Sequence, residues 1–421
     1  MCAPAPRIAD TEMDISAEPS DAPKPRPLQK RAAETRARIT AGVIEVLAGQ
    51  GAAGCTHRAV AKAAGVSLAA TTYHFDTKGA MIEAASQALL DGYVADFDRV
   101  DARLAAGEAT GISGLPDLVQ RVAGNALGRA RIRSLAWCEI MLQGGRDPAR
   151  RDSVAAWYAE TDRLWLRIAR HLDPTIEAEA ARDAVDQVVG LTFLLHPLQP
   201  TPAEVQDLLT GQSTLSALLD RLPSDPPLDD AASPARQRVI DAAIAILIDD
   251  GVAGISYRAV AERAGLARSG PAHHFASIDA LIEAAQRTLF ARAKTRYRDA
   301  LAGAGGPVTT RANLLDLTTA VFFREVLEHP RESVGFYSVW VVAAQSPVLR
   351  GVVAAAQRDQ HRAWCRRLAS LPNPPPAEST ALRVQAQFIG MLIRAVAAGG
   401  DLDRLREARQ AFAALLGPEP A

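Results

Sequence analysis

The sequence predicts an all-α protein made of two tandem helical units, and two observations support this fold class. Shifted by 200 residues, the chain matches itself without a gap, and 17 of the 39 paired positions between Gly51/Gly251 and Leu89/Leu289 are identical. Outside this repeat, the Ala-, Leu- and Arg-rich stretches have helical spacing and almost no strand signal. Solenoid repeats are about 20–50 residues long, so a period of this length indicates two domains.

The first predicted helix of the repeat begins near Arg36 and carries one apolar stripe in each copy. The members of the stripe recur at helical spacing and are Ile39, Val43, Val46 and Leu47, then Val239, Ala243, Ile246 and Leu247. Gly51 and Gly251 end this helix. Thr56 and Ser256 follow as suitable N-caps of a second, short helix.

The second helix of each copy is predicted to end at a glycine, Gly65 or Gly265, because glycine tolerates the left-handed geometry of a C-cap. After a tight turn, a third helix is predicted over 67–73 and over 267–273, and a phenylalanine closes each unit. Small alanines between the short helices allow their backbones to approach closely. This arrangement is typical of a helix-turn-helix.

Three segments of the first copy have the spacing of a known DNA-binding domain: Thr56-x-Arg58-x-Val60-Ala61, Ala64-Gly65-Val66-Ser67 and Tyr73-His74-Phe75-x-x-Lys78. In this pattern the chain resembles the tetracycline-repressor (TetR) family. The second copy departs from the pattern at two places, because Ile278 replaces the phosphate-contacting lysine and Pro271 falls within the recognition helix. The resemblance implies two TetR-like units, each a three-helix head followed by an α-helical regulatory bundle, that together form a pseudo-dimer.

Prolines and polar stretches divide the chain into six predicted segments. Residues 1–28 contain six prolines and are expected to be a disordered leader, and the polar, proline-bearing stretch 221–234 is expected to be a linker. The resemblance places the helix-turn-helix domains at 29–79 and 235–279 and the bundles at 80–220 and 280–421. It further implies that the last two helices of each bundle, near 177–195 and 205–219 and near 380–398 and 402–416, pair across the halves.

Composition sets further limits on the function. The four cysteines, Cys2, Cys55, Cys138 and Cys365, have no C-x-x-C spacing and are too few for a disulfide framework or a zinc module, so neither a metal nor a disulfide framework is predicted. The sequence shows no apolar run of about 18 residues and no signal-peptide pattern, so we expect a cytoplasmic protein without membrane contact. Glycine-rich phosphate loops and catalytic motifs are missing, so we expect neither an enzyme nor a cofactor.

The two heads differ in charge, although the whole chain carries a net charge of only −1. From Lys30 to Lys78 the chain has seven Lys/Arg and three Asp/Glu, a local net charge of +4. From Asp230 to Ile278 it has five of each, a local net charge of zero. Phosphate neutralisation supplies most non-specific affinity for DNA. The first head is therefore predicted to hold the DNA backbone more strongly than the second.

The resemblance also implies which side chains face double-stranded DNA. Phosphates would be met by Thr56, Arg58 and Lys78 in the first head and by Ser256 and Arg258 in the second. Base edges would be met by Leu68, Ala69, Ala70, Thr72, Tyr73 and His74, and by Arg268, Ser269, Gly270, Ala272, His273 and His274. Two alternatives stay open, namely that Tyr73 is a core aromatic residue and that the two helix-start arginines are only solvated charges.

Aromatic and sulfur-bearing residues gather in the predicted bundles of a chain that is only 5% aromatic. Candidate lining residues of an apolar effector cavity are Trp137, Met141, Trp157, Phe193, Phe336, Trp340, Trp364 and Phe388. TetR-like proteins bind small molecules between such helices. The alternative is that each of these residues belongs to the core of its bundle.

Taken together, the sequence and the resemblance predict a ligand-responsive transcriptional regulator, a repressor, whose two unlike heads read an asymmetric operator. The expected partners are operator DNA and a small apolar effector. The fused halves are expected to form an intramolecular pseudo-dimer, and further self-association is left open. The alternative function is a regulator whose second head is degenerate and serves as a scaffold for protein interaction or dimerisation.

Overall fold

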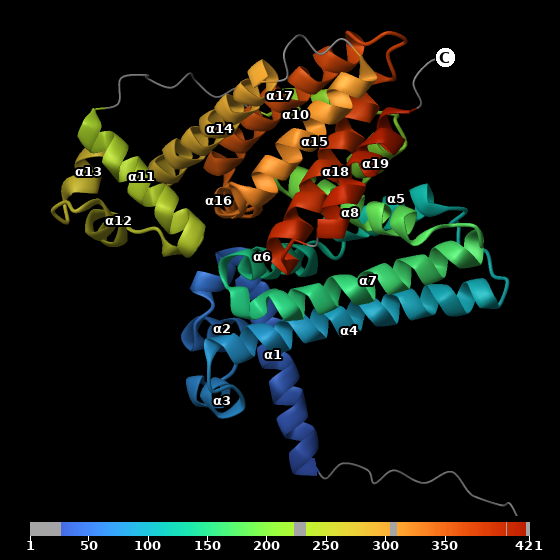
Figure 1. Cartoon of the computed structure of the whole chain (residues 1–421). Coiled ribbons are helices and arrows are strands. Elements are labelled where there is room, and N and C mark those ends of the chain that lie inside the picture. The colour runs from blue at the N-terminus through green and yellow to red at the C-terminus, as the bar shows by residue number, and fades with distance from the viewer. Residues whose placement is uncertain (1–26, 223–232, 304–309, 401, 418–421) are drawn as a thin grey trace, which may run out of the picture.

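A computed structural model describes the chain at residues 27–222, 233–303, 310–400 and 402–417. All regular structure in these ranges is helical, as predicted, and no strand occurs among the residues described. The predicted leader up to residue 26 and the middle of the predicted linker, 223–232, lie outside the described residues. Figure 1 shows the two halves in blue to green and in yellow to red.

The first half begins with three helices at the predicted head and continues with a bundle. Its helices are α1 (Pro27–Gly54), α2 (His57–Ala64), α3 (Leu68–His74), α4 (Lys78–Ala105), α5 (Leu115–Leu127), α6 (Arg131–Arg146), α7 (Arg151–Leu172), α8 (Ala178–Leu195), α9 (Pro202–Leu209) and α10 (Leu215–Asp220). Two 3-10 turns, η1 (Pro148–Arg150) and η2 (His196–Leu198), join them.

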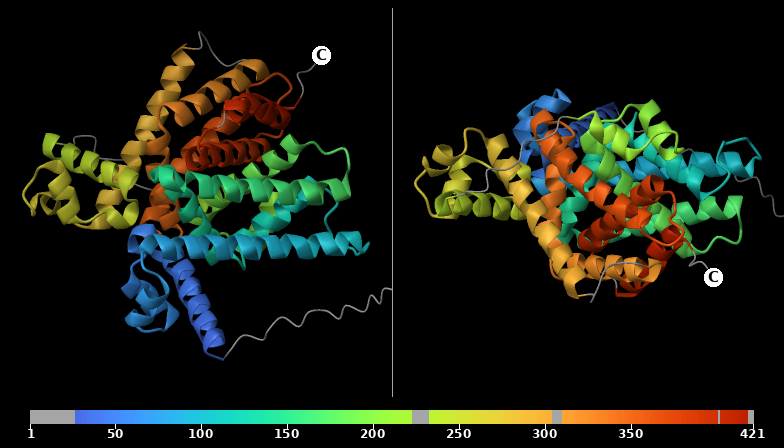
Figure 2. Two further views of the ribbon diagram at one scale, coloured as in Figure 1. Left: turned by 60° about the horizontal axis from the view of Figure 1, so that its bottom comes forward. Right: turned by 90° about the horizontal axis from the view of Figure 1, so that it is seen from above.

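The second half repeats this order. Its helices are α11 (Pro234–Asp249), η3 (Val252–Gly254), α12 (Tyr257–Ala264), α13 (Gly270–His274), α14 (Ile278–Gly303), α15 (Arg311–Leu327), α16 (Pro330–Ala343), α17 (Pro347–Ala369), α18 (Ala377–Ala398) and α19 (Leu402–Leu416). The two heads protrude separately, α11–α13 at the left and α1–α3 at the bottom of Figure 1 and of the left view of Figure 2.

The predicted caps of the heads are confirmed. The Thr56 hydroxyl accepts a hydrogen bond from the backbone N–H of Ala59 at 3.1 Å, and the Ser256 hydroxyl caps α12 in the same way. Gly65 and Gly265 end α2 and α12 with φ of 61° and 64°, which is the left-handed region that glycine adopts at little cost. These local signals fix the helix-turn-helix independently in each copy.

The third helix of the second head is shorter than predicted. Its counterpart α3 begins after the N-cap Ser67, whereas α13 covers only five residues and leaves Arg268 in the preceding turn. Pro271 explains the difference, because proline has no backbone N–H and fits a helix only in its first turn. The helix therefore cannot begin much earlier than Gly270.

The two halves pack against each other along α8 and α18, which cross at the centre of the molecule (Figure 1). Gly190 lies against the backbone of Ala386, and Gly390, its equivalent 200 residues later, lies against the backbone of Asp186. A Cβ atom on either glycine would overlap a backbone carbonyl oxygen of the opposite helix. The repeat therefore appears in space as a two-fold-like contact between equivalent helices.

The predicted pairing of the last two helices across the halves is dominated by α8 and α18, and the others take a smaller part: α10 packs on α18, and Glu407 of α19 pairs with Arg182 of α8 at 3.1 Å. The predicted helix at 205–219 is split into α9 and α10 around Gly211, which has a φ of 76°. α10 packs on α17 and α18, whereas α19 packs on α15 and α18 of its own half. The expected symmetric four-helix contact is therefore replaced by an unequal one.

One helix of the described residues, α18, is long and apolar enough by length and composition to cross a membrane. No such apolar run was predicted from the sequence. Of its apolar window, 78% is buried inside the protein, and α6, α7, α8, α17 and α19 pack around it. α18 is therefore the central core helix of the two joined halves.

Candidate functional site

The recognition helix of the first head exposes large apolar side chains to solvent. Tyr73 is 82% exposed and Leu68 is 52% exposed, whereas Phe75 is 3% exposed. Of the two aromatic residues, only Phe75 is thus part of the core, where the Arg36 guanidinium lies 4.3 Å from the centre of its ring. An exposed tyrosine and leucine on a short helix are available to contact base edges and thymine methyl groups.

The remaining candidates of the first head are distributed around this helix. Ala69 and Thr72 are exposed and Ala70 and His74 are half-buried. At the start of α2, the exposed Arg58 follows the cap, and Lys78 is the first residue of α4. The Lys78 ammonium lies 3.5 Å from the carbonyl oxygen of Ala53. This lysine therefore stands where the end of α1 meets the start of α4.

The second head presents a different surface. Arg268, Ser269 and His273 are exposed, whereas Gly270 and His274 are half-buried. These side chains offer a guanidinium and imidazoles where the first head offers a leucine and a tyrosine.

Part of the positive charge of the second head is neutralised within the protein. Asp249 accepts hydrogen bonds from Arg263, at 2.7 Å, and from Arg331 of α16. At the position equivalent to Lys78, Ile278 is half-buried and packs against the core. Arg258 is exposed at the start of α12, in the place of Arg58 in the first head. The net positive charge of the second head is therefore smaller than that of the first head.

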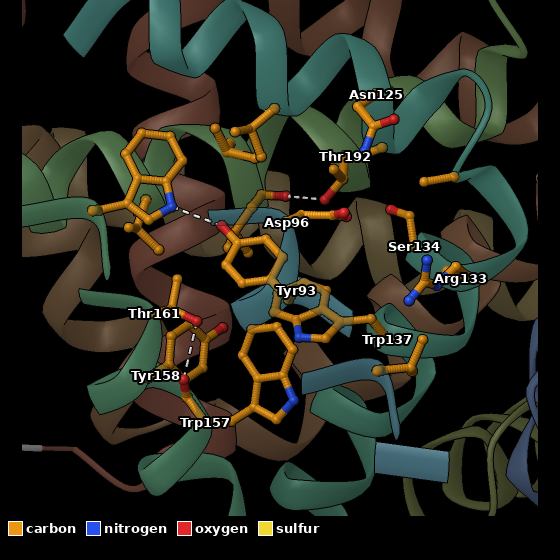
Figure 3. A pocket seen from close by; sticks show the side chains of 18 residues that line it. Tyr93, Asp96, Asn125, Arg133, Ser134, Trp137, Trp157, Tyr158, Thr161 and Thr192 are labelled. Carbon is orange, nitrogen blue, oxygen red and sulfur yellow. Dashed lines mark hydrogen bonds between the residues drawn. The ribbon is translucent and has the colours of Figure 1, made fainter. Parts of the chain in front are cut away.

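The first bundle contains a cavity of about 130 Å³ with an aromatic wall (Figure 3). The aromatic lining residues are Tyr93, Trp137, Trp157, Tyr158 and Trp165. Trp165 donates a hydrogen bond from Nε1 to the Tyr93 hydroxyl at 2.7 Å. By contrast, the indole N–H groups of Trp137 and Trp157 and the hydroxyl of Tyr158 have no partner among the described protein atoms.

The polar side of this cavity is largely neutral. Ser134 lines it and lies 2.9 Å from Nε2 of His196. Burial, with the nearby charge of Arg131, lowers the pKa of His196 to about 3, so its ring is neutral at physiological pH. Asp96 and Arg133 also line the cavity and carry one charge of each sign.

The second bundle contains a larger cavity, of about 480 Å³, with a different chemistry. Phe336, Trp364 and Phe388 line it. The charged lining residues are Lys294, Arg296, Arg298, Glu325, Glu332, Asp359, Arg362, Arg366 and Arg367. Arg296 is held by Glu325 and Glu332 at 2.7 Å, but cations outnumber anions on this wall. The two cavities therefore differ in both volume and charge.

Three predicted lining residues lie elsewhere. Phe193 and Trp340 are about 1% exposed and line neither large cavity, because their rings pack in the core with Tyr337. Met141 is fully buried and borders only a gap of about 10 Å³ between the halves. The prediction that these three line an effector cavity is corrected. Helical periodicity predicts that a residue is buried. It does not predict whether the buried side chain lines a cavity or packs against a neighbouring helix.

α6 connects the first cavity with both heads, a relation that the sequence analysis missed. The buried Glu139 carboxylate accepts hydrogen bonds from the backbone N–H of Ala52, in the first head, and from Gln143, both at 3.0 Å. It lies 3.5 Å from Arg146, which donates to Ser338 of α16 and lies beside Gly251 of the second head. One buried ion pair on α6 thus touches the equivalent turns of the two heads.

Comparison with known proteins identifies the heads. The family described as "Bacterial regulatory proteins, tetR family" matches residues 39–85 and again residues 239–285. The HTH-type transcriptional regulator BetI of Burkholderia thailandensis is 26% identical over 171 residues, which are 40% of this chain and 85% of that protein. An uncharacterized HTH-type transcriptional regulator of Xanthobacter autotrophicus is 25% identical over 176 residues, 41% of this chain and 84% of that protein.

Two solved structures are also similar over part of the chain. The multidrug binding protein EbrR complexed with imidazole is 26% identical, with a TM-score of 0.34, and covers 45% of this chain and 98% of its own. The ketosteroid transcriptional regulator KstR2 of Mycobacterium tuberculosis is 19% identical, with a TM-score of 0.32, and covers 44% of this chain and 95% of its own.

The helix-turn-helix heads and the relatives define the class of this protein as a transcriptional regulator rather than an enzyme. Each similar regulator covers less than half of the chain, whereas the family match occurs twice. The chain carries the DNA-binding unit of the tetR family twice, in tandem.

Proposed function

We propose that this protein is a ligand-responsive repressor that presents two unlike heads to an operator with two unlike half-sites. The observation that supports the proposal most strongly is the difference between the exposed surfaces, Leu68 and Tyr73 in one head and Arg268 and His273 in the other. A homodimer presents identical helices and selects palindromes, but a fused pair is free of this constraint. The domain boundaries given above belong to the same proposal.

A single chain is the proposed DNA-binding unit, and it works in the cytoplasm, where operator DNA is accessible. Fusion makes the pairing of the halves intramolecular, at a high effective concentration. Half-sites about 34–36 Å apart require a set spacing of the heads. α6 would change that spacing when a ligand enters the first cavity, because it lines the cavity at Trp137 and holds the two heads through Glu139 and Arg146.

The effector of the first cavity is proposed to be a small, mainly apolar molecule that carries a hydrogen-bond acceptor. Three aromatic donors of the wall, on Trp137, Trp157 and Tyr158, find no acceptor among the described protein atoms. A buried donor without a partner costs about 1–3 kcal/mol, and an oxygen atom of a ligand would remove this cost. The aromatic faces would cover the apolar remainder of the ligand.

The asymmetric operator is tested by selecting binding sequences with the wild-type chain and with Arg268→Ala. An arginine bidentate to guanine is worth about 1–3 kcal/mol of discrimination. We therefore expect Arg268→Ala to relax the selected sequence in one half-site, by about 5–150-fold at one position, and to leave the other half unchanged. A selected consensus that is a perfect inverted repeat would contradict the proposal.

The matched control for this experiment is Lys78→Ala, which removes a proposed phosphate contact of the first head. This variant should weaken binding to all sequences alike and reduce the slope of affinity against salt concentration by about one. Arg258→Ala should have a smaller effect than Arg58→Ala because the second head has no local excess of positive charge. The opposite order would show that the charge argument is wrong.

The effector proposal is tested with a panel of small apolar ketones, esters and amides, scored by release of a labelled operator. For a compound that releases DNA, Trp157→Phe should weaken binding about tenfold, because phenylalanine keeps the aromatic ring but lacks the N–H. Trp364→Phe in the second cavity is the control and should leave this affinity unchanged. Equal affinities of wild type and Trp157→Phe would exclude the proposed contact.

The scaffold function of the second head remains the second candidate, and two observations favour it. Ile278 cannot contact phosphate, and Asp249 pairs with two arginines of this region. The operator selection distinguishes the two functions. A scaffold predicts one conserved half-site and no effect of Arg268→Ala.

A further inference from the structure

Three side chains of different chemistry meet at one point of the second half. His361 and Cys365 lie one turn apart on α17, and Glu378 lies in the first turn of α18. Nε2 of His361 is 2.9 Å from Oε2 of Glu378, and Sγ of Cys365 is 3.6 Å from Nε2 of His361 and 3.7 Å from Oε1 of Glu378. His361 is fully buried, and the other two are half-buried.

These separations are those of ligands on one tetrahedral zinc ion. Zinc bonds of about 2.3 Å to sulfur and about 2.0–2.2 Å to nitrogen and oxygen place tetrahedral ligands about 3.3–3.6 Å apart. The 2.9 Å from Nε2 of His361 to Oε2 of Glu378 and the 3.6 Å from Nε2 to Sγ of Cys365 fall within about 0.4 Å of these values. One ligand atom from each of the three residues lies within 4.8 Å of the others, so an ion can enter with small side-chain shifts. We propose that His361, Cys365 and Glu378 bind one Zn²⁺ ion, with a water molecule as the fourth ligand.

The donor set also fits zinc in its charge. A thiolate and a carboxylate together neutralise the two positive charges of the ion, which reduces the cost of its burial. One nitrogen, one sulfur and one oxygen ligand with an open fourth position is a combination typical of zinc rather than of Mg²⁺ or Ca²⁺, which prefer oxygen alone.

Binding requires one net proton to leave the site. Without the ion, Nε2 of His361 donates to Glu378, and Nδ1 lies 2.7 Å from the Gln385 amide nitrogen, which also donates to the carbonyl of Ala381. In the zinc-bound state the imidazole proton moves from Nε2 to Nδ1, and Gln385 turns its amide oxygen toward it. The thiol of Cys365 releases its proton to solvent as the Cys365–Zn bond forms.

The proposed site stands at the junction of the two halves. Ser216 of α10 donates a hydrogen bond to Oε1 of Glu378 at 2.8 Å, and Arg358 of α17 donates to the carbonyl of Leu219 at 2.6 Å. α10, α17 and α18 pack together in the upper part of Figure 1. Zinc would therefore join α17 to α18 within the second half, beside the hydrogen bond by which Ser216 of the first half contacts Glu378.

The first half has no equivalent of this site. The positions 200 residues earlier are Thr161, Trp165 and Ala178, a set without cysteine, histidine or carboxylate. The three ligands are thus a property of one half and not of the repeated fold. A metal bound here distinguishes the two halves and acts on one bundle only.

The site is tested on the purified full-length chain after treatment with a chelator. Titration with Co²⁺ should give one equivalent of bound metal, visible bands of a tetrahedral ion and a sulfur-to-cobalt charge-transfer band, and Zn²⁺ should displace it. Cys365→Ser should lose the charge-transfer band and weaken Zn²⁺ binding by about 100-fold or more, because even outer-shell changes cost 10–100-fold. Cys138→Ser, at a buried cysteine of the first half, is the matched control and should bind normally.

Glu378→Gln provides a second variant with a neutral side chain of equal size, and it should weaken Zn²⁺ binding while keeping the sulfur-to-cobalt band. Circular dichroism of each metal-free variant verifies that it is folded. A charge-transfer band that persists in Cys365→Ser would overturn the proposal. So would equal Zn²⁺ affinities of the wild-type chain and both ligand variants.

Discussion

Replacing Arg394 by methionine is expected to lower the free energy of unfolding by about 3–5 kcal/mol, the cost of removing one partner from a buried ion pair. Arg394 lies on α18 of the second half, but its charge partners lie in the first. Its Nε donates to Asp186 at 2.6 Å, and its two Nη atoms donate to Asp162 at 2.8 and 2.9 Å. Its guanidinium also lies 4.3 Å from the ring centre of Tyr158.

The loss is large because Asp186 is fully buried, so its carboxylate cannot recover the lost interaction from water. Urea denaturation of both proteins measures the difference. Arg409→Met is the matched control, because its partner Asp316, at 3.0 Å, is as exposed as the arginine itself. An exposed pair contributes about 0–1 kcal/mol. An Arg394→Met variant as stable as this control would contradict the account of the junction.

Replacing Gly190 by alanine is expected to be about as damaging, with a loss of about 3 kcal/mol or more. The added Cβ would overlap the carbonyl oxygen of Ala386, and a backbone atom cannot rotate away as a side chain can. α8 and α18 would therefore have to separate along their length. Gly390→Ala should act in the same way on the carbonyl of Asp186.

Gly124→Ala in α5 makes the same chemical change where no heavy atom lies within 4 Å of the new Cβ. Alanine is favoured over glycine inside a helix by about 0.5–1 kcal/mol, so this control should be neutral or stabilising. Thermal and urea unfolding measure stability, and small-angle scattering reports whether the halves separate. A neutral Gly190→Ala would mean that the close approach of the two helices is not needed for stability.

The parts of the fold that depend on local sequence could be predicted, whereas contacts between distant residues could not. Caps such as Thr56, turns such as Gly65 and the core position of a head phenylalanine follow from neighbours within a few residues. The contact of Gly190 with Ala386 joins residues far apart in the chain. The sequence does not show which residue a glycine within a helix will contact. The sequence likewise does not show that Arg394 forms ion pairs with aspartates of α7 and α8.

The candidate sites show the same division. The four-residue spacing of His361 and Cys365 is visible in the sequence, but Glu378 follows a proline-rich connection whose path local rules do not determine. Trp137 and Trp157 were predicted to line a cavity and do so, but their shared space arises from the packing of α6 on α7. Glu139 and Arg146 pair with each other on α6, but they also contact Ala52 and Ser338, which are far away in the chain. The sequence alone therefore does not show that this pair is buried.

The joining of α8 and α18 within one polypeptide has a consequence for gene control. When a regulator that must first dimerise is dilute, the concentration of its active dimer falls with the square of the chain concentration. For a chain that carries both halves, the concentration of active regulator falls only in proportion to the chain concentration. In the proposed function, operator occupancy would follow a simple hyperbola in the number of chains per cell. Halving that number at cell division would reduce the pool of active regulators by no more than a factor of about two.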